Sequence, residues 1–118
     1  MIETLERISV GDISIDIDWL MVDNERYSIY EQQVGEVVNS ITVLKPRQCT
    51  RGHRHSHWES YTFAEDGLTI YLNGMGKDVT SPQTLEIPPK VHHMVRNNTD
   101  QPIAFLCQWL ASDVNKGH

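Results

Sequence analysis

Three alternate histidines and a glutamate stand together near the middle of the sequence. Residues 52–61 read Gly-His-Arg-His-Ser-His-Trp-Glu-Ser-Tyr, which places His53, His55, His57 and Glu59 within one short stretch. Neutral imidazoles and a carboxylate are ligands that zinc, iron, nickel, manganese and cobalt accept in proteins. The stretch therefore indicates a site for one divalent transition metal.

The spacing of these side chains demands a bend in the chain. Alternate residues of an extended strand share one face, but a rise of ~3.3 Å per residue separates His53 from Glu59 by roughly 20 Å. Bonds from such metals to nitrogen and oxygen are only about 2.0 to 2.2 Å long. We therefore expect a turn at 56–58, with His53 and His55 on one strand and Glu59 opening the next.

A further ligand must come from another part of the chain. Residues 88–97 hold two of the remaining three histidines, His92 and His93. The residues alone leave alternatives open: His55 and His57 could form the ligand pair in place of His53 and His55, or all these histidines could be structural. The structural alternative needs another source of hydrogen bonds, because a buried polar group without a partner costs free energy.

The elements around the two clusters have the pattern of β-strands. Apolar and polar residues alternate over 13–19, and runs rich in β-branched or aromatic residues end at turn residues such as Glu65-Asp66-Gly67. The expected strands are 13–19, 37–44, 53–55, 58–64, 68–72, 85–87, 93–96 and 103–110, with 26–31 as a mixed segment. About eight to ten strands without a helical period predict a single all-β domain over 1–118, a jelly-roll sandwich or barrel. Such a roll brings His93 beside His53 and His55.

The first cluster resembles the first sequence motif of the cupin superfamily, G-x5-H-x-H-x3-E-x6-G. Over 47–67 the motif is matched by His53, His55 and Glu59, while Gly67 comes one residue late and Arg47 stands at a glycine place. The second motif, G-x5-P-x-G-x2-H-x3-N, resembles residues 82–97. Its matches are Pro88, His93 and Asn97, and its two glycine places hold Pro82 and Lys90.

The resemblance implies a cupin-like jelly roll whose interior holds a divalent metal, with Fe, Zn, Mn or Ni as candidates. Carried over position by position, the ligands would be His53, His55, Glu59 and His93, and Asn97 would be a structural turn residue. The glycine departures concern the shape of the loops and the width of the pocket.

Other side chains could serve a reaction beside the metal. Tyr61 lies two residues after Glu59 and so faces the same way on a strand, where its hydroxyl could act as general acid or base. Arg51 shares the face of His53 and could bind an anionic group. His57 and His92 are candidates for the rim of the pocket, where they would contact substrate.

The superfamily hosts many activities, so fold alone does not select one. The leading hypothesis is a metal-dependent enzyme of the isomerase or epimerase type, acting on a small, oxygen-rich, anionic metabolite such as a sugar or sugar acid. An Fe(II) dioxygenase, a metal-assisted lyase and a non-catalytic module that binds a small ligand are the alternatives.

Composition limits the partners. The formal net charge of −6 argues against general nucleic-acid binding. No apolar stretch approaches the ~18 residues of a membrane span, and the first residues do not resemble a signal peptide. We therefore expect a cytoplasmic protein with a small-molecule substrate and no membrane partner. We also expect a homodimer, with 13–19 as a candidate edge strand.

Overall fold

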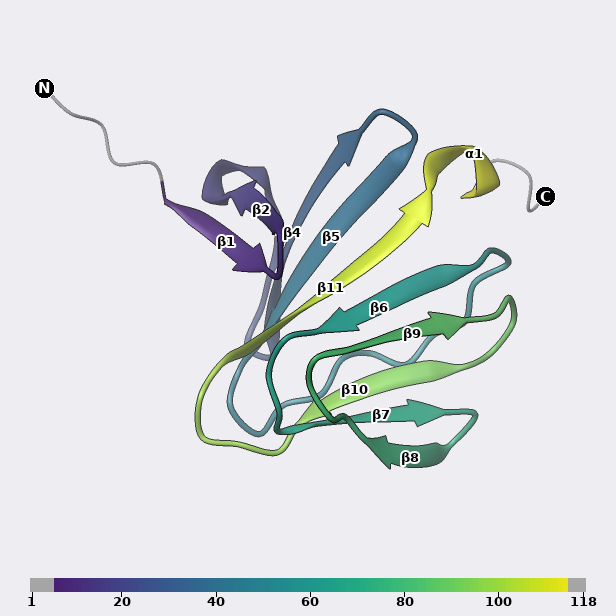
Figure 1. Ribbon diagram of the computed structural model, residues 1–118. Coiled ribbons are helices and arrows are strands. Elements are labelled where there is room, and N and C mark those ends of the chain that lie inside the picture. Colours follow the sequence, from purple (N-terminus) through teal and green to yellow (C-terminus); the bar gives the residue numbers. More distant parts are fainter. Residues whose placement is uncertain (1–5, 115–118) are drawn as a thin grey trace, which may run out of the picture.

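The computed structural model describes residues 6–114 of the 118-residue chain. Strands dominate these residues, and the expected all-β fold is confirmed (Figure 1). The strands are β1 (Arg7–Val10), β2 (Ile13–Asp16), β3 (Leu20–Asp23), β4 (Tyr27–Val34), β5 (Val37–Leu44), β6 (Glu59–Phe63), β7 (Leu68–Leu72), β8 (Met75–Asp78), β9 (Gln83–Ile87), β10 (His93–Asn97) and β11 (Ile103–Leu110). Two short helical turns, η1 (Ile17–Trp19) and α1 (Ala111–Val114), complete the described part of the chain.

The strands form two main antiparallel sheets, as expected for a jelly roll. One sheet has the order β3-β4-β5-β11-β6-β9, and the other has the order β10-β7-β8. β11 pairs with β5 along its whole length, although about sixty residues separate them in sequence. The expected bounds of β5, β7 and β11 agree with the structure residue for residue. β1, β3 and β8 were not expected as strands, and β4 was expected only as a mixed segment over 26–31.

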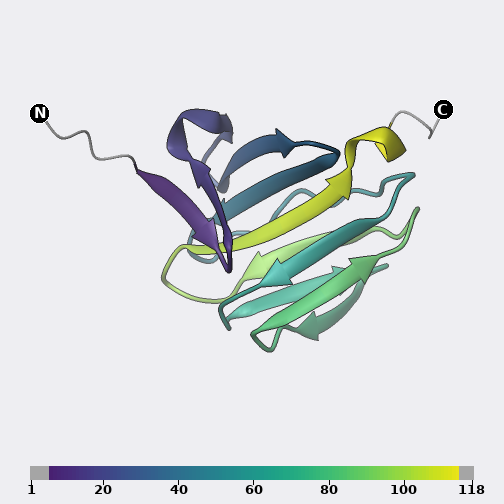
Figure 2. The same cartoon turned by 45° about the horizontal axis from the view of Figure 1, so that its top comes forward.

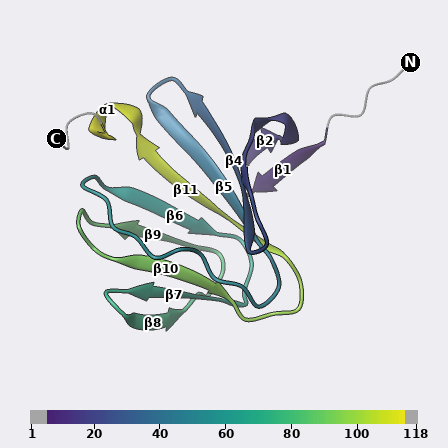
Figure 3. The same cartoon turned by 180° about the vertical axis from the view of Figure 1, so that it is seen from behind.

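The connection from β5 to β6 runs alongside β10, as seen from behind in Figure 3. His53 and His93 exchange two backbone hydrogen bonds, N–H to carbonyl, of 3.2 and 2.9 Å, and the Thr50 amide donates to the Val95 carbonyl at 2.8 Å. The expectation of a strand carrying both His53 and His55 is nevertheless wrong, because only an isolated bridge forms at His53. β10 begins at His93 and offers no partner beyond it, so the Lys90 amide binds the His55 carbonyl instead, at 2.6 Å.

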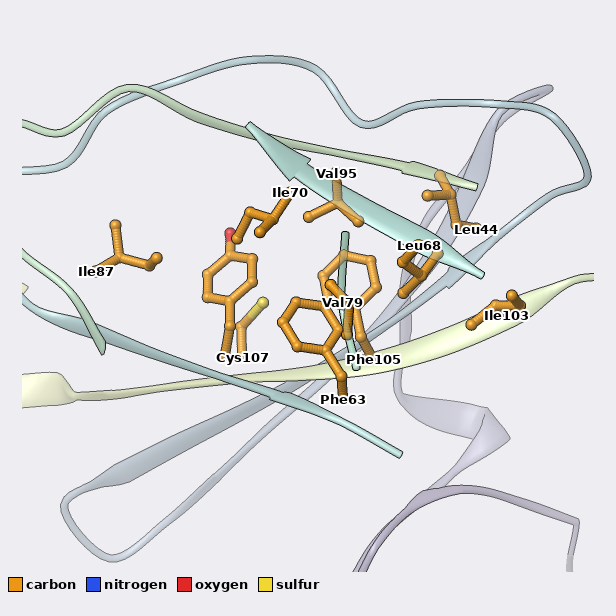
Figure 4. Close-up of a cluster of buried hydrophobic side chains, with 11 residues drawn as sticks. Leu44, Phe63, Leu68, Ile70, Val79, Ile87, Val95, Ile103, Phe105 and Cys107 are labelled. Carbon is orange, nitrogen blue, oxygen red and sulfur yellow. The ribbon is translucent and has the colours of Figure 1, made fainter. Parts of the chain in front are cut away.

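Hydrocarbon side chains pack one end of the space between the sheets. Phe63 and Phe105 are 0% and 1% exposed, and their rings lie 5.7 Å apart between centroids. Leu44, Leu68 and Ile103 lie in the same cluster (Figure 4). Burial of such side chains contributes about 1.5 to 3 kcal/mol each to folding. This packed end holds the two sheets at a fixed separation.

The hairpin of β1 and β2 covers the outer face of the six-stranded sheet (Figure 2). Val10 and Ile15 are buried there against Ile41 and Leu106. The expected strand 13–19 is too long, because it ends at Asp16, whose carboxylate accepts a hydrogen bond from the Asp18 amide at 2.8 Å and opens η1. Among residues 6–114, no helix has the length and apolarity needed to cross a bilayer.

Candidate metal centre

The four predicted ligands converge at the end of the interior opposite to the packed core. His53 and His55 come from the connection before β6, Glu59 is the first residue of β6, and His93 is the first residue of β10. One potential ligand atom from each of the four lies within 4.8 Å of the others. The predicted bend is present at Ser56 and His57, and it lets His55 and Glu59 approach each other.

The orientation of His93 suits a metal ligand. Its Nδ1 lies 3.0 Å from the Val91 carbonyl oxygen. A carbonyl oxygen can only accept a hydrogen bond, so Nδ1 carries the hydrogen and Nε2 presents a lone pair. That lone pair is directed into the cluster, where Nε2 lies 3.7 Å from Glu59 Oε1. Fixing the outer nitrogen in this way is how proteins orient histidines that bind metals.

Glu59 and His93 are buried polar groups whose inner atoms lack partners. Their exposed fractions are 4% and 2%, yet within residues 6–114 neither Glu59 Oε1 nor His93 Nε2 makes a hydrogen bond. The His55 Nε2 atom lies 2.6 Å from Glu59 Oε1 without hydrogen-bonding geometry. Such orphaned atoms cost free energy unless something binds them. A cation at this point would bind both, so the residues fit a divalent metal.

The protonation of the histidines also favours a metal. Burial lowers the pKa of His93, and burial followed by the neighbouring His55 and His93 rings lowers the pKa of His53. Both imidazoles are therefore held neutral, the form that binds a metal.

A cavity of about 360 Å³ opens in front of three of the ligands, His53, His55 and Glu59. The apolar part of its remaining wall comes mainly from β3, β4, β11 and α1: Met21, Tyr27, Ile29, Phe105, Trp109 and Val114. A pocket of this size accommodates a small metabolite. The cavity thus joins the ligand cluster to a space in which a substrate could bind.

Tyr61 lies at the base of this cavity. The side chain is 4% exposed, and its ring meets that of His93 edge-on with centroids 5.4 Å apart. Burial raises the pKa of Tyr61 well above its usual value, and the neighbouring Cys107 and Glu59 raise it further. The hydroxyl therefore keeps its proton and can donate a hydrogen bond beside the ligand cluster.

The three predicted substrate-binding residues are placed differently. Arg51 and His57 line the cavity, and the His57 ring lies 6.1 Å from that of Trp109. His92 does not line it. Its imidazole lies against Gly52, where an added Cβ would meet ring atoms at 2.6 Å, and its amide donates to Asn73 Oδ1 at 3.0 Å. The His92 side chain therefore packs against backbone outside the cavity.

Two of the glycine places of the motifs keep glycine-like backbone. Arg47 has φ 64° and Lys90 has φ 68°, values in the left-handed region that glycine adopts without steric cost. Pro82, at a third such place, cannot adopt this conformation.

Sequence reasoning found Tyr27 as a candidate for an aromatic wall of the cavity but missed Ile29 and Glu31. These three are alternate residues of β4, and all of them line the cavity. Their spacing is a weak strand signal, because the intervening Tyr30 is aromatic and the last inward residue is charged.

Comparison with solved structures places this architecture among known folds. A protein of Photorhabdus luminescens shares 16% identity at a TM-score of 0.70, over 92% of this chain and 94% of that one. A cupin-2 domain from Rhodospirillum rubrum shares 17% identity at a TM-score of 0.69, over 78% of this chain and 68% of that one.

A third similar structure is that of a DMSP lyase. It shares 16% identity at a TM-score of 0.63, over 75% of this chain and 49% of that one, so this chain spans about half its length. Neither protein-family models nor curated proteins give a match to the sequence. The chain has the cupin fold, with a cluster of three histidines and one glutamate that could hold a metal.

Proposed function

We propose that the protein is a metal-dependent enzyme that acts on a small, oxygen-rich, anionic metabolite by proton transfer, as an isomerase or epimerase of sugars or sugar acids does. The observation that carries this proposal is the pair of unpartnered atoms, Glu59 Oε1 and His93 Nε2, directed at one point beside a cavity. A site built only for stability would leave neither atom without a hydrogen bond.

The cavity residues have distinct roles in this proposal. The bound metal, with Fe, Zn, Mn or Ni as candidates, would supply a Lewis acid that polarises a carbonyl or hydroxyl of the substrate. Tyr61, whose hydroxyl is protonated, would donate its hydrogen to the oxygen of the substrate that gains charge. Arg51 is exposed at the cavity and would pair with the anionic group of the substrate.

A metal-assisted lyase is the second candidate. Two observations favour it: the similarity in fold to a DMSP lyase, and the position of the buried Tyr61 beside the ligand His93. An Fe(II) dioxygenase would use the same four ligands, and a binding module would use the same cavity without turnover. Oxygen consumption by the iron-loaded protein would single out the dioxygenase.

The first experiment is elemental analysis of protein purified without chelator. We expect close to one transition metal per chain in the wild type and loss of that metal in His53→Ala and in His93→Ala. His92→Ala is the matched control, because His92 neighbours His93 but does not line the cavity, and it should keep the metal. A wild type without metal after reconstitution, or equal loss in the control, would contradict the proposal.

The second experiment tests catalysis. Metal-loaded protein is incubated in D2O with a panel of aldoses, uronic acids and hydroxy acids, and proton exchange next to the carbonyl is followed by NMR. We expect exchange with at least one class, reduced roughly 100-fold or more in Tyr61→Phe while the metal is retained. Binding to the protein without exchange or turnover of any compound would favour the binding module.

The expectations on location and assembly remain proposals. We propose a cytoplasmic homodimer in which exposed apolar residues of η1 and β3, namely Trp19, Leu20 and Met21, contribute to the contact. Of these three, Trp19 belongs to the segment 13–19 that the sequence offered as an edge strand, and Leu20 and Met21 follow it. A monomer by light scattering at micromolar concentration would exclude this assembly.

A further inference from the structure

A row of protic side chains crosses the inner face of the six-stranded sheet. Glu31 on β4 lies opposite Ser40 on β5, Ser40 lies opposite Cys107 on β11, and Cys107 lies opposite Tyr61 on β6. Residues directly opposite each other on neighbouring strands point to the same face. All four line the cavity, so the row leads across its base from the side of the metal centre to the far wall.

Glu31 is the charged end of this row. Among the residues that line the cavity, Glu31 and Glu59 are the two acids, and Glu59 belongs to the ligand cluster. Strands in a sheet lie about 4.8 Å apart, so three steps place the backbones of Glu31 and Tyr61 about 14 Å from each other. The two side chains line the same cavity at the two ends of this row, and a short molecule lying along the row could touch both.

The Glu31 carboxylate has no cation beside it in the described residues. Within residues 6–114 no basic side chain forms an ion pair with it. Its polar neighbours are Ser40 across the strand pair and the acid Glu59, and burial followed by the charge of Glu59 raises its pKa. The other inward residues of β4, Tyr27 and Ile29, are largely hydrocarbon. An apolar residue in place of Glu31 would continue this wall, so stability alone does not account for the carboxylate.

We infer that Glu31 is a specificity-determining residue: it accepts a hydrogen bond from a hydroxyl or ammonium group at the end of the ligand remote from the metal. This inference rests on the proposed function, because it takes the opposite end of the ligand to be bound at the metal centre and near Arg51. Together these contacts define the ligand that the cavity would accept. It is a small molecule with an anionic oxygen group at one end, an apolar middle that matches Ile29 and Phe105, and a hydrogen-bond donor at the other end.

The test uses short carboxylates of similar length with different ends. Zinc-loaded protein is titrated by NMR with butyrate, γ-hydroxybutyrate, γ-aminobutyrate and glutarate. We expect γ-aminobutyrate to bind roughly tenfold more tightly than butyrate, as a charge-assisted hydrogen bond gives, and glutarate to bind most weakly because its second carboxylate meets Glu31. In Glu31→Gln the preference for γ-aminobutyrate over butyrate should disappear, and the affinity for glutarate should rise.

Controls separate this inference from the proposed function. Glu36→Gln alters an exposed acid of the β4–β5 turn and should leave the preferences unchanged. Zinc content is measured in every variant, and Glu31→Gln should keep its zinc. Absence of zinc from the wild type would contradict the proposed function. The preference for the donor end would then be measured in the metal-free protein, with Arg51 as the remaining partner of the probe carboxylate. Equal affinity for butyrate and γ-aminobutyrate, a preference that survives in Glu31→Gln, or no binding of any probe would overturn the assignment of Glu31.

Discussion

His93 and Asn97 are the two ends of strand β10, and both are buried polar residues, with exposed fractions of 2% and 0%. Asn97 uses all its polar atoms. Its Nδ2 donates to the carbonyls of Leu44 at 3.0 Å and Gln101 at 2.7 Å, and its Oδ1 accepts from the Thr99 amide at 2.9 Å. His93 uses only Nδ1, and its Nε2 has no partner within the described residues.

This difference indicates that Asn97 stabilises the fold, whereas His93 is positioned to bind a ligand. The side chain of Asn97, with every polar atom hydrogen-bonded, joins the end of β10 to the end of β5 and to the turn before β11. These contacts lie at the packed end of the interior. An unpartnered nitrogen makes His93 a source of instability that only a bound group can offset. The same strand therefore serves stability at one end and the proposed chemistry at the other.

Replacing Asn97 should give the largest effect. Asn97→Ala removes the amide that satisfies buried carbonyls, and we expect the free energy of unfolding to fall by about 3 kcal/mol. Urea unfolding measures this loss, and metal content per folded chain should not change. Asn98→Ala is the matched control: its exposed side chain donates one hydrogen bond to Thr69, so the loss should stay near 1 kcal/mol. Equal losses in both variants would show that Asn97 has no special role.

Acid should destabilise the metal-free protein through His93. Its folded pKa lies below the ordinary value of 6.5 because burial disfavours the charged ring. Below about pH 6.5 the unfolded chain therefore binds more protons than the folded chain. The free energy of unfolding then decreases as the pH is lowered, until the pH has passed the lowered pKa of the folded state. Unfolding in chelator, compared at about pH 7.5 and about pH 5.5, measures this dependence. His93→Gln should reduce this dependence and leave the part due to His53, whose pKa burial also lowers. Asn97→Ala should keep the slope of the wild type, and a flat curve in the wild type would refute the prediction.

Replacing Glu59 should act in the opposite direction to replacing Asn97. In Glu59→Gln the buried oxygen without a partner no longer carries charge, so the metal-free protein should be as stable as the wild type or about 1 kcal/mol more stable. The stabilisation that added zinc gives the wild type should be lost. Thermal unfolding with chelator and with zinc measures both effects. A metal-free variant clearly less stable than the metal-free wild type would mean that Glu59 supports the fold itself.

The sequence revealed the ligand cluster more reliably than the cavity. His53, His55, Glu59 and His93 were identifiable because metal ligands need specific residue types at specific spacings. β5, β7 and β11 were identifiable because their residues are β-branched or apolar and end at clear turns. Glu31 was not, because its place opposite Ser40 depends on strand register, which local sequence does not specify. The place of His92 outside the cavity lining was likewise not readable from local sequence, because its ring lies against Gly52, forty positions away.

The smallest expected effect concerns the backbone that supports the metal centre. Lys90 has φ 68°, and a non-glycine residue in this region carries a cost of roughly 1 to 2 kcal/mol. Lys90→Gly removes that cost but gives the unfolded chain more freedom, worth about 0.5 to 1 kcal/mol, so we expect a net gain between zero and about 1.5 kcal/mol. Lys90→Ala keeps the steric cost and should give no gain. Metal affinity should be unchanged in both variants, because the Lys90 amide still donates to the His55 carbonyl. A loss of stability in Lys90→Gly would mean that the lysine side chain, rather than the backbone shape of the loop, supports the ligand cluster.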